Sequence, residues 1–263
     1  MELYDLKGIA KFIVAGGKGI LAADESNPTC AKRFDAIGVA STENNRRDYR
    51  EMLFRSKGIS GNIGGVILFD ETIRQCAADG TTFADLLLEQ NALPGIKVDQ
   101  GLTHLENLPN ETLTTGLEGL DERLTEYAAL GARFTKWRAV LNIGDGKPSS
   151  EAIDENMSAL AQYAKCAQNT GMVPIVEPEV LMDGDHTIDA CYEATEKSLK
   201  SLFQHLEARD VDIEGTLLKP NMVTAGTECA TQASVEEVAR KTLDCLIGTV
   251  PVDLPGITFL SGG

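Results

Sequence analysis

Residues 134–143 read Phe-Thr-Lys-Trp-Arg-Ala-Val-Leu-Asn-Ile, and residues 173–177 read Val-Pro-Ile-Val-Glu. Both are mostly apolar runs of strand length without strict polar alternation, which is typical of strands covered on both faces. Between them, apolar residues recur at the spacing of one helical face: Ile153, Met157, Leu160, Ala161 and Ala164. A strand, a helix and a second strand in this order predict a parallel β–α–β unit.

The same alternation extends along the whole sequence. Strand-like runs begin near residues 19, 64, 94, 134, 173, 215 and 256, so the steps are 45, 30, 40, 39, 42 and 41 residues. A nearly constant step favours a ring of equal units over two nucleotide-binding halves, and the usual closed ring is the (β/α)8 barrel. We therefore predict an α/β fold, a (β/α)8 TIM barrel. The seventh strand-like run ends with the sequence at Gly263, so we expect only about seven βα units. We therefore expect residues 1–263 to form a single incomplete domain and to be a fragment of a longer protein.

Composition narrows the classes of function. Lys plus Arg number 24 and Asp plus Glu 40, so the net charge is −16. A chain this acidic is not a general nucleic-acid binder, because a phosphate backbone requires a basic face. No apolar run approaches the ~20 residues of a membrane span, and the N-terminus has no signal-peptide pattern. We expect neither a nucleic acid nor a membrane as partner. We place the chain in the cytoplasm, with the plastid stroma as the alternative.

The cysteines and histidines do not form a metal-binding pattern. The six cysteines include no Cys-x-x-Cys pair, so we expect free thiols. His104, His186 and His205 are far apart in the sequence. We expect His186, which follows Asp183 and Asp185, to lie in a solvated loop rather than in a metal site. The sequence predicts no metal and no cofactor.

Charged residues recur at or near the ends of the predicted strands. They are Asp24, Lys97, Asp99, Lys136, Arg138, Glu177, Glu179 and Lys219. The carboxyl ends of barrel strands meet at one mouth, where the active sites of such barrels lie. Lys136 and Arg138 are two residues apart, as are Glu177 and Glu179, so each pair points to one face of its strand. A rim of stabilising ion pairs is the alternative, but charges from five strands favour a reactive site.

Lys219 is the most informative of these residues, because Gly-Thr-Leu-Leu-Lys-Pro places a single charge in an apolar run. A lysine of ordinary pKa is only about 0.1% neutral at pH 7.4. Apolar surroundings and a second cation disfavour the ammonium form. A neutral amine can form a Schiff base with a carbonyl, and the resulting iminium is an electron sink for carbon–carbon cleavage. Nearby carboxylates can transfer the protons that this reaction requires.

Several segments resemble class I fructose-bisphosphate aldolase, in the order in which that family has them. They are residues 17–26 (GKGILAADES), 64–69 (GGVILF), 95–99 (GIKVD), 136–138 (KWR), 173–179 (VPIVEPE), 217–223 (LLKPNMV) and 259–263 (FLSGG). The combination of Glu-Pro-Glu and Leu-Leu-Lys-Pro-Asn-Met-Val is highly specific to the family. The resemblance implies a TIM barrel and a metal-free lyase. Such an enzyme reversibly cleaves fructose 1,6-bisphosphate to dihydroxyacetone phosphate and glyceraldehyde 3-phosphate, in glycolysis, gluconeogenesis or the Calvin cycle.

The resemblance also implies a role for each matching residue. Lys219 is the nucleophile, Glu177 the general acid and base, and Lys136 a cation that holds substrate and favours the neutral form of Lys219. Asp24 handles the C4 hydroxyl during cleavage, and Glu179 supports the charge network. The residues that match substrate- or phosphate-contacting positions are Ser26, Arg33, Lys97, Arg138, Ser261, Gly262 and Gly263. A Gly-Arg phosphate site on strand eight, a terminal helix and a C-terminal tail ending in Tyr belong to the family pattern beyond residue 263.

Two other functions remain open on the sequence. A catalytically impaired barrel fragment could bind sugar phosphates or proteins, because the eighth unit is missing. A transaldolase-type transferase would use the same lysine chemistry. The resemblance further implies a homo-oligomer, usually a tetramer, that acts on a phosphorylated sugar.

Overall fold

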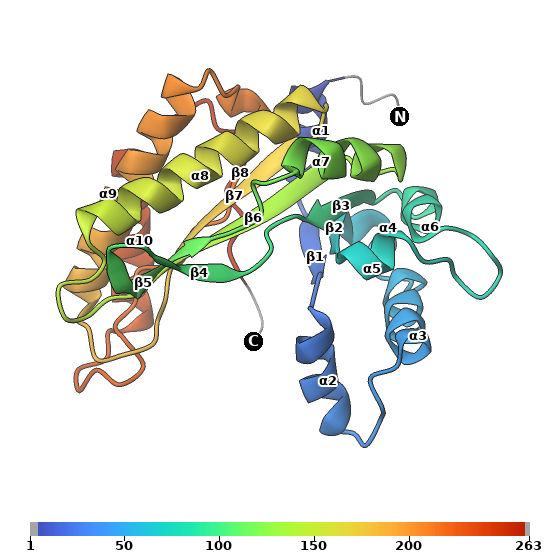
Figure 1. Cartoon of the computed structure of the whole chain (residues 1–263), viewed down its shortest axis with the longest axis horizontal. Coiled ribbons are helices and arrows are strands. Elements are labelled where there is room, and N and C mark those ends of the chain that lie inside the picture. Colours follow the sequence, from blue (N-terminus) through green and yellow to red (C-terminus); the bar gives the residue numbers. More distant parts are fainter. Residues whose placement is uncertain (1–4, 261–263) are drawn as a thin grey trace.

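The computed structural model describes residues 5–260 of the chain. Its centre is a curled parallel sheet in the order β1-β2-β3-β6-β7-β8 (Figure 1). Each strand therefore pairs with the next one of this sheet along the chain, as in a barrel. The strands are β1 (Gly19–Ala23), β2 (Ile63–Leu68), β3 (Leu93–Lys97), β6 (Phe134–Leu141), β7 (Val173–Val180) and β8 (Leu217–Leu218).

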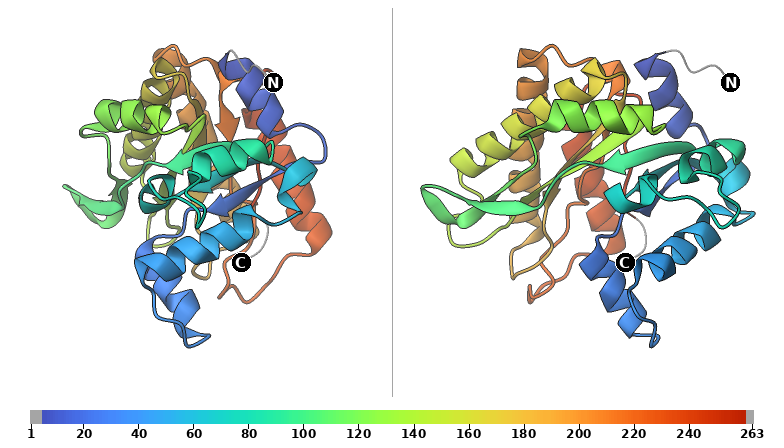
Figure 2. Two further views of the ribbon diagram at one scale, coloured as in Figure 1. Left: turned by 90° about the vertical axis from the view of Figure 1, so that its right-hand side faces the viewer. Right: turned by 45° about the vertical axis from the view of Figure 1, so that its right-hand side comes forward.

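Helices connect these strands and cover the outer face of the sheet (Figures 1 and 2). Those that follow β3, β6, β7 and β8 are α7 (Leu120–Ala129), α8 (Ser150–Asn169), α9 (Ile188–Ala208) and α10 (Val235–Thr249). The N-terminal half contains α1 (Leu6–Ile13), α2 (Asn27–Asp35), α3 (Glu43–Phe54), α4 (Ile59–Asn62), α5 (Asp70–Ile73) and α6 (Phe83–Glu89), and the short 3-10 helix η1 (Ile213–Gly215) precedes β8. None of the helices described is long and apolar enough to cross a membrane.

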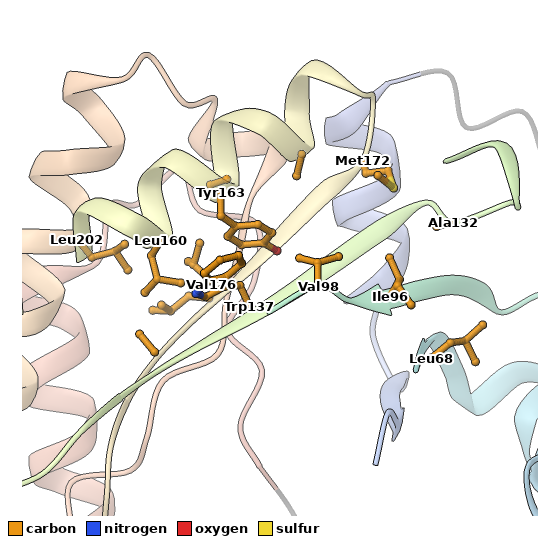
Figure 3. Packing of buried hydrophobic residues seen from close by; sticks show 14 of the residues in the cluster. Leu68, Ile96, Val98, Ala132, Trp137, Leu160, Tyr163, Met172, Val176 and Leu202 are labelled. Atoms are coloured by element: carbon orange, nitrogen blue, oxygen red, sulfur yellow. The ribbon is translucent and has the colours of Figure 1, made fainter. Parts of the chain in front are cut away.

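Helix α8 shows how local sequence builds this layer. Ser149 caps its first turn by accepting a hydrogen bond from the Ala152 N–H at 3.1 Å. The apolar face predicted from the sequence is buried against β6 and β7. There the Tyr163 ring stacks on Trp137, with centroids 5.4 Å apart (Figure 3). Both rings are completely buried, so this contact anchors the helix to the centre of the sheet.

A second apolar cluster fills the inside of the curled sheet, and α1 closes the amino end of the strands with Ile9 and Ile13. Phe134 lies at the centre of this cluster. A Cβ atom built on Gly65 would lie 2.7 Å from the Phe134 ring, and one on Gly95 would lie 2.3 Å from it. The ring therefore occupies the space that side chains on β2 and β3 would otherwise fill.

One predicted strand differs from the structure. The run at 257–260 is not a full strand. It forms one parallel bridge, Ile257 to Leu218, and Thr258 N donates to Leu218 O at 2.8 Å, because β8 offers only two residues for pairing. Helix α10 runs through Gly248 to Thr249 and ends at Val250, which is extended. The residue before a proline is disfavoured in helical conformation, so Pro251 sets this end.

The antiparallel hairpin of β4 (Leu102–Leu105) and β5 (Leu108–Thr114) was not predicted from the sequence. It follows β3 and extends beside the carboxyl end of β6 (Figure 1). Over residues 5–260 the parallel sheet is open between β1 and the segment at Ile257. A cavity of about 570 Å³ lies there, bordered by both.

Candidate active site

Three neighbouring strands bring two lysines to the same glutamate. Glu177 lies on β7, Lys136 on β6 and Lys219 directly after β8. Lys219 continues the parallel pairing, because its N–H donates to Val176 O at 2.9 Å. The strand register therefore places both amines beside the Glu177 carboxylate.

Lys136 is held between two carboxylates. Its Nζ lies 2.8 Å from Asp24 Oδ2 and 3.4 Å from Glu177 Oε2, and the residue is buried. Burial disfavours the ammonium and lowers its pKa, but the negative charges of Asp24 and Glu177 outweigh burial. The pKa of Lys136 is therefore raised above its ordinary value. Lys136 is a permanent cation at neutral pH.

Lys219 Nζ contacts the other oxygen of the same carboxylate, Glu177 Oε1. The Glu177 side chain is only 3% exposed and that of Lys219 16% exposed, so both are largely shielded from water. In the part of the chain that the structure describes, Glu177 Oε2 accepts no hydrogen bond, although the Lys136 ammonium is at ion-pair distance.

Two further ion pairs surround this centre. Arg138 contacts Glu179, and Lys97 Nζ lies 2.6 Å from Asp99 Oδ1 and donates to Asp99 O at 2.9 Å. The diagonal pairs Lys136–Glu177 and Arg138–Glu179 confirm that each two-residue spacing presents its charges on one face of its strand. The Arg138 side chain is 42% exposed, so it can still reach a ligand.

Ser26 directly precedes α2 near the end of β1, and Arg33 lies on α2. Ser26 Oγ caps the helix by accepting from Thr29 N at 3.4 Å. Arg33 is 59% exposed and contacts Glu25. The remaining predicted site residues, Ser261, Gly262 and Gly263, lie outside the described residues.

Lys219 borders two cavities. One, of about 350 Å³, is also lined by Arg138, Glu177 and Glu179. The other is the 570 Å³ cavity at the open edge of the sheet, which Arg33 also lines. A small molecule in the 350 Å³ cavity would lie near the carboxylates of Glu177 and Glu179 and the guanidinium of Arg138. A small molecule in the 570 Å³ cavity would lie near the guanidinium of Arg33.

Asn221 was assigned no role from the sequence, although it belongs to the motif at residues 217–223. Asn221 Oδ1 accepts from Val180 N at 3.1 Å, and its amide donates to Thr195 Oγ1 on α9 at 3.0 Å. It thereby ties the segment that carries Lys219 to the end of β7. The signal available in the sequence was its position, two residues after Lys219 in a polar turn.

His186 was expected in a solvated loop, and this expectation was wrong. The residue is only 7% exposed, because the loop after β7 packs against the segment after β8, where Gly226 N donates to His186 O at 2.8 Å. Between residues 5 and 260, no group of three or more His, Cys, Asp or Glu side chains is arranged to hold a metal ion. All six cysteines are free thiols.

The family model described as "Fructose-bisphosphate aldolase class-I" matches residues 5–263. The chain belongs to the class I fructose-bisphosphate aldolase family. A probable fructose-bisphosphate aldolase class 1 of Xanthomonas campestris is 54% identical over 263 residues, which are 100% of this chain and 79% of that protein. Fructose-bisphosphate aldolase C-B of Danio rerio is 52% identical over 260 residues, 98% of this chain and 72% of its own length.

A solved structure of a fructose-bisphosphate aldolase agrees with the fold. The Plasmodium falciparum aldolase, in complex with TRAP and a small molecule inhibitor, superposes with a TM-score of 0.96 at 48% identity. The match covers 98% of this chain and 75% of that one. The expected aldolase fold, function and lyase class are thus confirmed, and family membership implies a phosphorylated sugar as substrate. The binding-module alternative is not favoured.

Proposed function

We propose that Lys219 is the residue that forms the Schiff base, with Glu177 as its proton-transfer partner. The observation that carries this assignment is the buried Glu177 carboxylate, which contacts Lys219 through one oxygen and has Lys136 beside the other. An ammonium cannot attack a carbonyl, so Lys219 must first lose a proton. Glu177 is the proton acceptor in direct contact with it.

The first half of the reaction uses these two residues. The neutral Lys219 amine bonds to the C2 ketone carbon, and the carbonyl oxygen takes up a proton from Glu177. The attacking nitrogen then loses a proton to the Glu177 carboxylate, which passes it to the hydroxyl group on C2. That group leaves as water, and an iminium between Nζ and C2 remains. Lys136, which remains charged, holds the oxygen-rich substrate through its ammonium.

Carbon–carbon cleavage uses Asp24. Its carboxylate takes the proton of the C4 hydroxyl while the C3–C4 bond breaks, and the bonding pair moves to the iminium nitrogen. The aldehyde leaves, and the enamine on Lys219 takes up at C3 the proton that the Asp24 carboxylate had accepted. Water then adds to C2 and releases dihydroxyacetone phosphate. Glu179 supports this chemistry by fixing Arg138 at the mouth of the cavity.

The phosphate groups would meet the cationic and hydrogen-bonding residues at the rim. Arg138 and Arg33 border the cavities on either side of Lys219, and Ser26 and Lys97 lie at the ends of adjacent elements. Ser261, Gly262 and Gly263 would bind the other phosphate, because consecutive backbone N–H groups after a strand bind anions well. We further propose a single domain over residues 1–263, a cytoplasmic location and a homo-tetramer. Light scattering on a sizing column tests the oligomeric state.

Covalent trapping tests the assignment of Lys219. Borohydride added with dihydroxyacetone phosphate should reduce the iminium and leave a stable adduct, which peptide mass spectrometry locates on Lys219. The variant Lys219→Ala should give no adduct, while Lys165→Ala, which removes a lysine outside the site, should be trapped like the parent chain. A chelator should not reduce trapping. An adduct on another lysine, or trapping that survives in Lys219→Ala, would contradict the assignment.

A further inference from the structure

Arg50 on α3 is completely buried, which is unusual for a guanidinium. Its Nε donates to Ala23 O at 3.1 Å, and its Nη2 donates to Glu25 O at 2.6 Å. Nη2 also lies 3.7 Å from the Glu25 carboxylate. The two carbonyl groups belong to the residues immediately before and after Asp24, so one side chain holds the backbone on both sides of that residue.

The backbone at Asp24 needs such support, because the sheet no longer provides it. The last residue of β1 that pairs with β2 is Ala23, which lies opposite Leu68. Asp24 follows this pair, and its carboxylate reaches Lys136 at 2.8 Å. A planar guanidinium can fix two acceptors at a set separation, which a lysine ammonium cannot do.

We propose that Arg50 is a positioning residue of the aldolase reaction, which holds the chain on both sides of Asp24 and so aims the Asp24 carboxylate at Lys136 and at the substrate. The inference rests on the role proposed above for Asp24. Arg50 lines neither of the two cavities beside Lys219, so it acts through Asp24 and not by contact with substrate.

The chain provides a matched control one helical turn earlier. Arg46 is also on α3 and is also buried, at 8% exposure. It binds Glu71 at 2.7 and 2.6 Å and Ser41 O at 2.6 Å. Its described partners therefore do not include the residues that flank Asp24. A role of buried arginines in general fold stability predicts the same effect for both positions, whereas the positioning role predicts an effect for Arg50 only.

The first experiment does not depend on turnover. In the full chain, the pH dependence of acetylation at Lys136 is measured by competitive labelling with acetic anhydride and mass spectrometry. The variants are Arg50→Lys, Arg46→Lys, Asp24→Asn and the double variant Arg50→Lys/Asp24→Asn. Circular dichroism confirms that each is folded, and Arg50→Gln replaces Arg50→Lys if the latter unfolds.

The expected results follow from the ion pair between Asp24 and Lys136. Asp24→Asn removes a negative charge, so Lys136 should react at lower pH than in the parent chain. Arg50→Lys should move the profile in the same direction, Arg46→Lys should not, and the double variant should resemble Asp24→Asn alone. Equal shifts for the two arginine variants, no shift for Arg50→Lys, or additive shifts in the double variant would overturn the proposal.

The second experiment separates two steps of the reaction. Dihydroxyacetone phosphate has no C4, so its trapping on Lys219 does not require Asp24. Arg50→Lys should change the trapping rate less than ~3-fold and lower cleavage of fructose 1,6-bisphosphate by roughly 10–100-fold, as expected for a misplaced catalytic group. Equal losses in both steps would refute a positioning role. Absence of trapping in the parent chain would instead refute the function proposed for Lys219, while the Lys136 profiles would still test Arg50.

Discussion

Glu177 connects the two lysines of the site and is almost completely buried. A buried charge is costly unless it is paired, and this one is paired twice. Its two partners differ in surroundings, because Lys136 also has Asp24 within 2.8 Å. Lys136 is thereby held as a cation between two carboxylates, whereas, among the described carboxylates, Lys219 contacts only Glu177. In the function proposed above, this one carboxylate serves Lys136 as a counter-ion and Lys219 as a proton acceptor.

Replacing Glu177 with Gln tests this dual role at the residue scale. The amide preserves the shape but can no longer take up a proton, so we expect borohydride trapping on Lys219 to slow by ~10²–10⁴-fold. The matched control is Glu179→Gln, two residues along the same strand, which removes the partner of Arg138. It should affect trapping much less. Similar rates for the two variants would show that Glu177 is not the proton-transfer group.

Helix α3 shows how an element can appear solvent-exposed in sequence and still have a buried face. Its sequence is very polar, and one face of the helix is exposed. Its inner face is formed by Arg46, Arg50 and Phe54, at a spacing of four residues. Arg46 pairs with Glu71 at the start of α5, and Arg50 donates to the backbone at the end of β1. Sequence alone could not show this, because the burial of an arginine depends on acceptors that are distant in the chain.

The pair between α3 and α5 should make stability depend on pH. The Arg46 guanidinium lowers the pKa of the Glu71 carboxyl below its ordinary value, although burial acts in the opposite direction. The pKa of this carboxyl group is lower in the folded state than in the unfolded state. The ion pair therefore contributes its full stability above the unfolded-state pKa, and this contribution is lost as the pH falls through the folded-state pKa. Glu71→Gln should therefore reduce the free energy of unfolding by ~1–3 kcal/mol at neutral pH.

Urea unfolding at several pH values measures this effect. The difference between Glu71→Gln and the parent chain should shrink as pH falls below about 4, where unfolded carboxyl groups are protonated. Glu106→Gln, at an exposed position, is the control and should cost less than ~0.5 kcal/mol at any pH. A difference for Glu71→Gln that stays constant down to low pH would contradict the ion-pair explanation.

At the scale of the whole molecule, the constant step between strand-like runs predicted the parallel order of the sheet. Apolar runs also located β1, β2, β3, β6, β7 and β8 to within a few residues. The hairpin β4–β5 was not predicted because it pairs locally and because β4 is largely exposed, so Leu102–Leu105 has no continuous apolar run. The strand ends identified Asp24, Lys136, Glu177 and Lys219 as one site. Which oxygen each amine meets could not be predicted, because it depends on the register between strands.

The same architecture predicts an uneven distribution of local stability. β6 and β7 have neighbours on both sides and α8 above them, with Trp137 and Tyr163 fully buried at the contact. Their amide hydrogens should exchange slowest, and those of β4, where Leu102 is 53% exposed, much faster. Hydrogen exchange followed by mass spectrometry measures both in one experiment. Comparable protection of β4 and β6 would show that the hairpin is part of the most stable unit.

The packing of Phe134 against the backbone of Gly65 and Gly95 limits which residues can replace these three. Positions 65, 95 and 134 share one volume, which a single aromatic ring now fills. A methyl group added at either glycine is incompatible with the ring. A shorter residue at 134 would leave a void that side chains from β2 and β3 could occupy together. Substitutions at the three positions are thus coupled, and a redesign of the inner layer succeeds only if it changes them together.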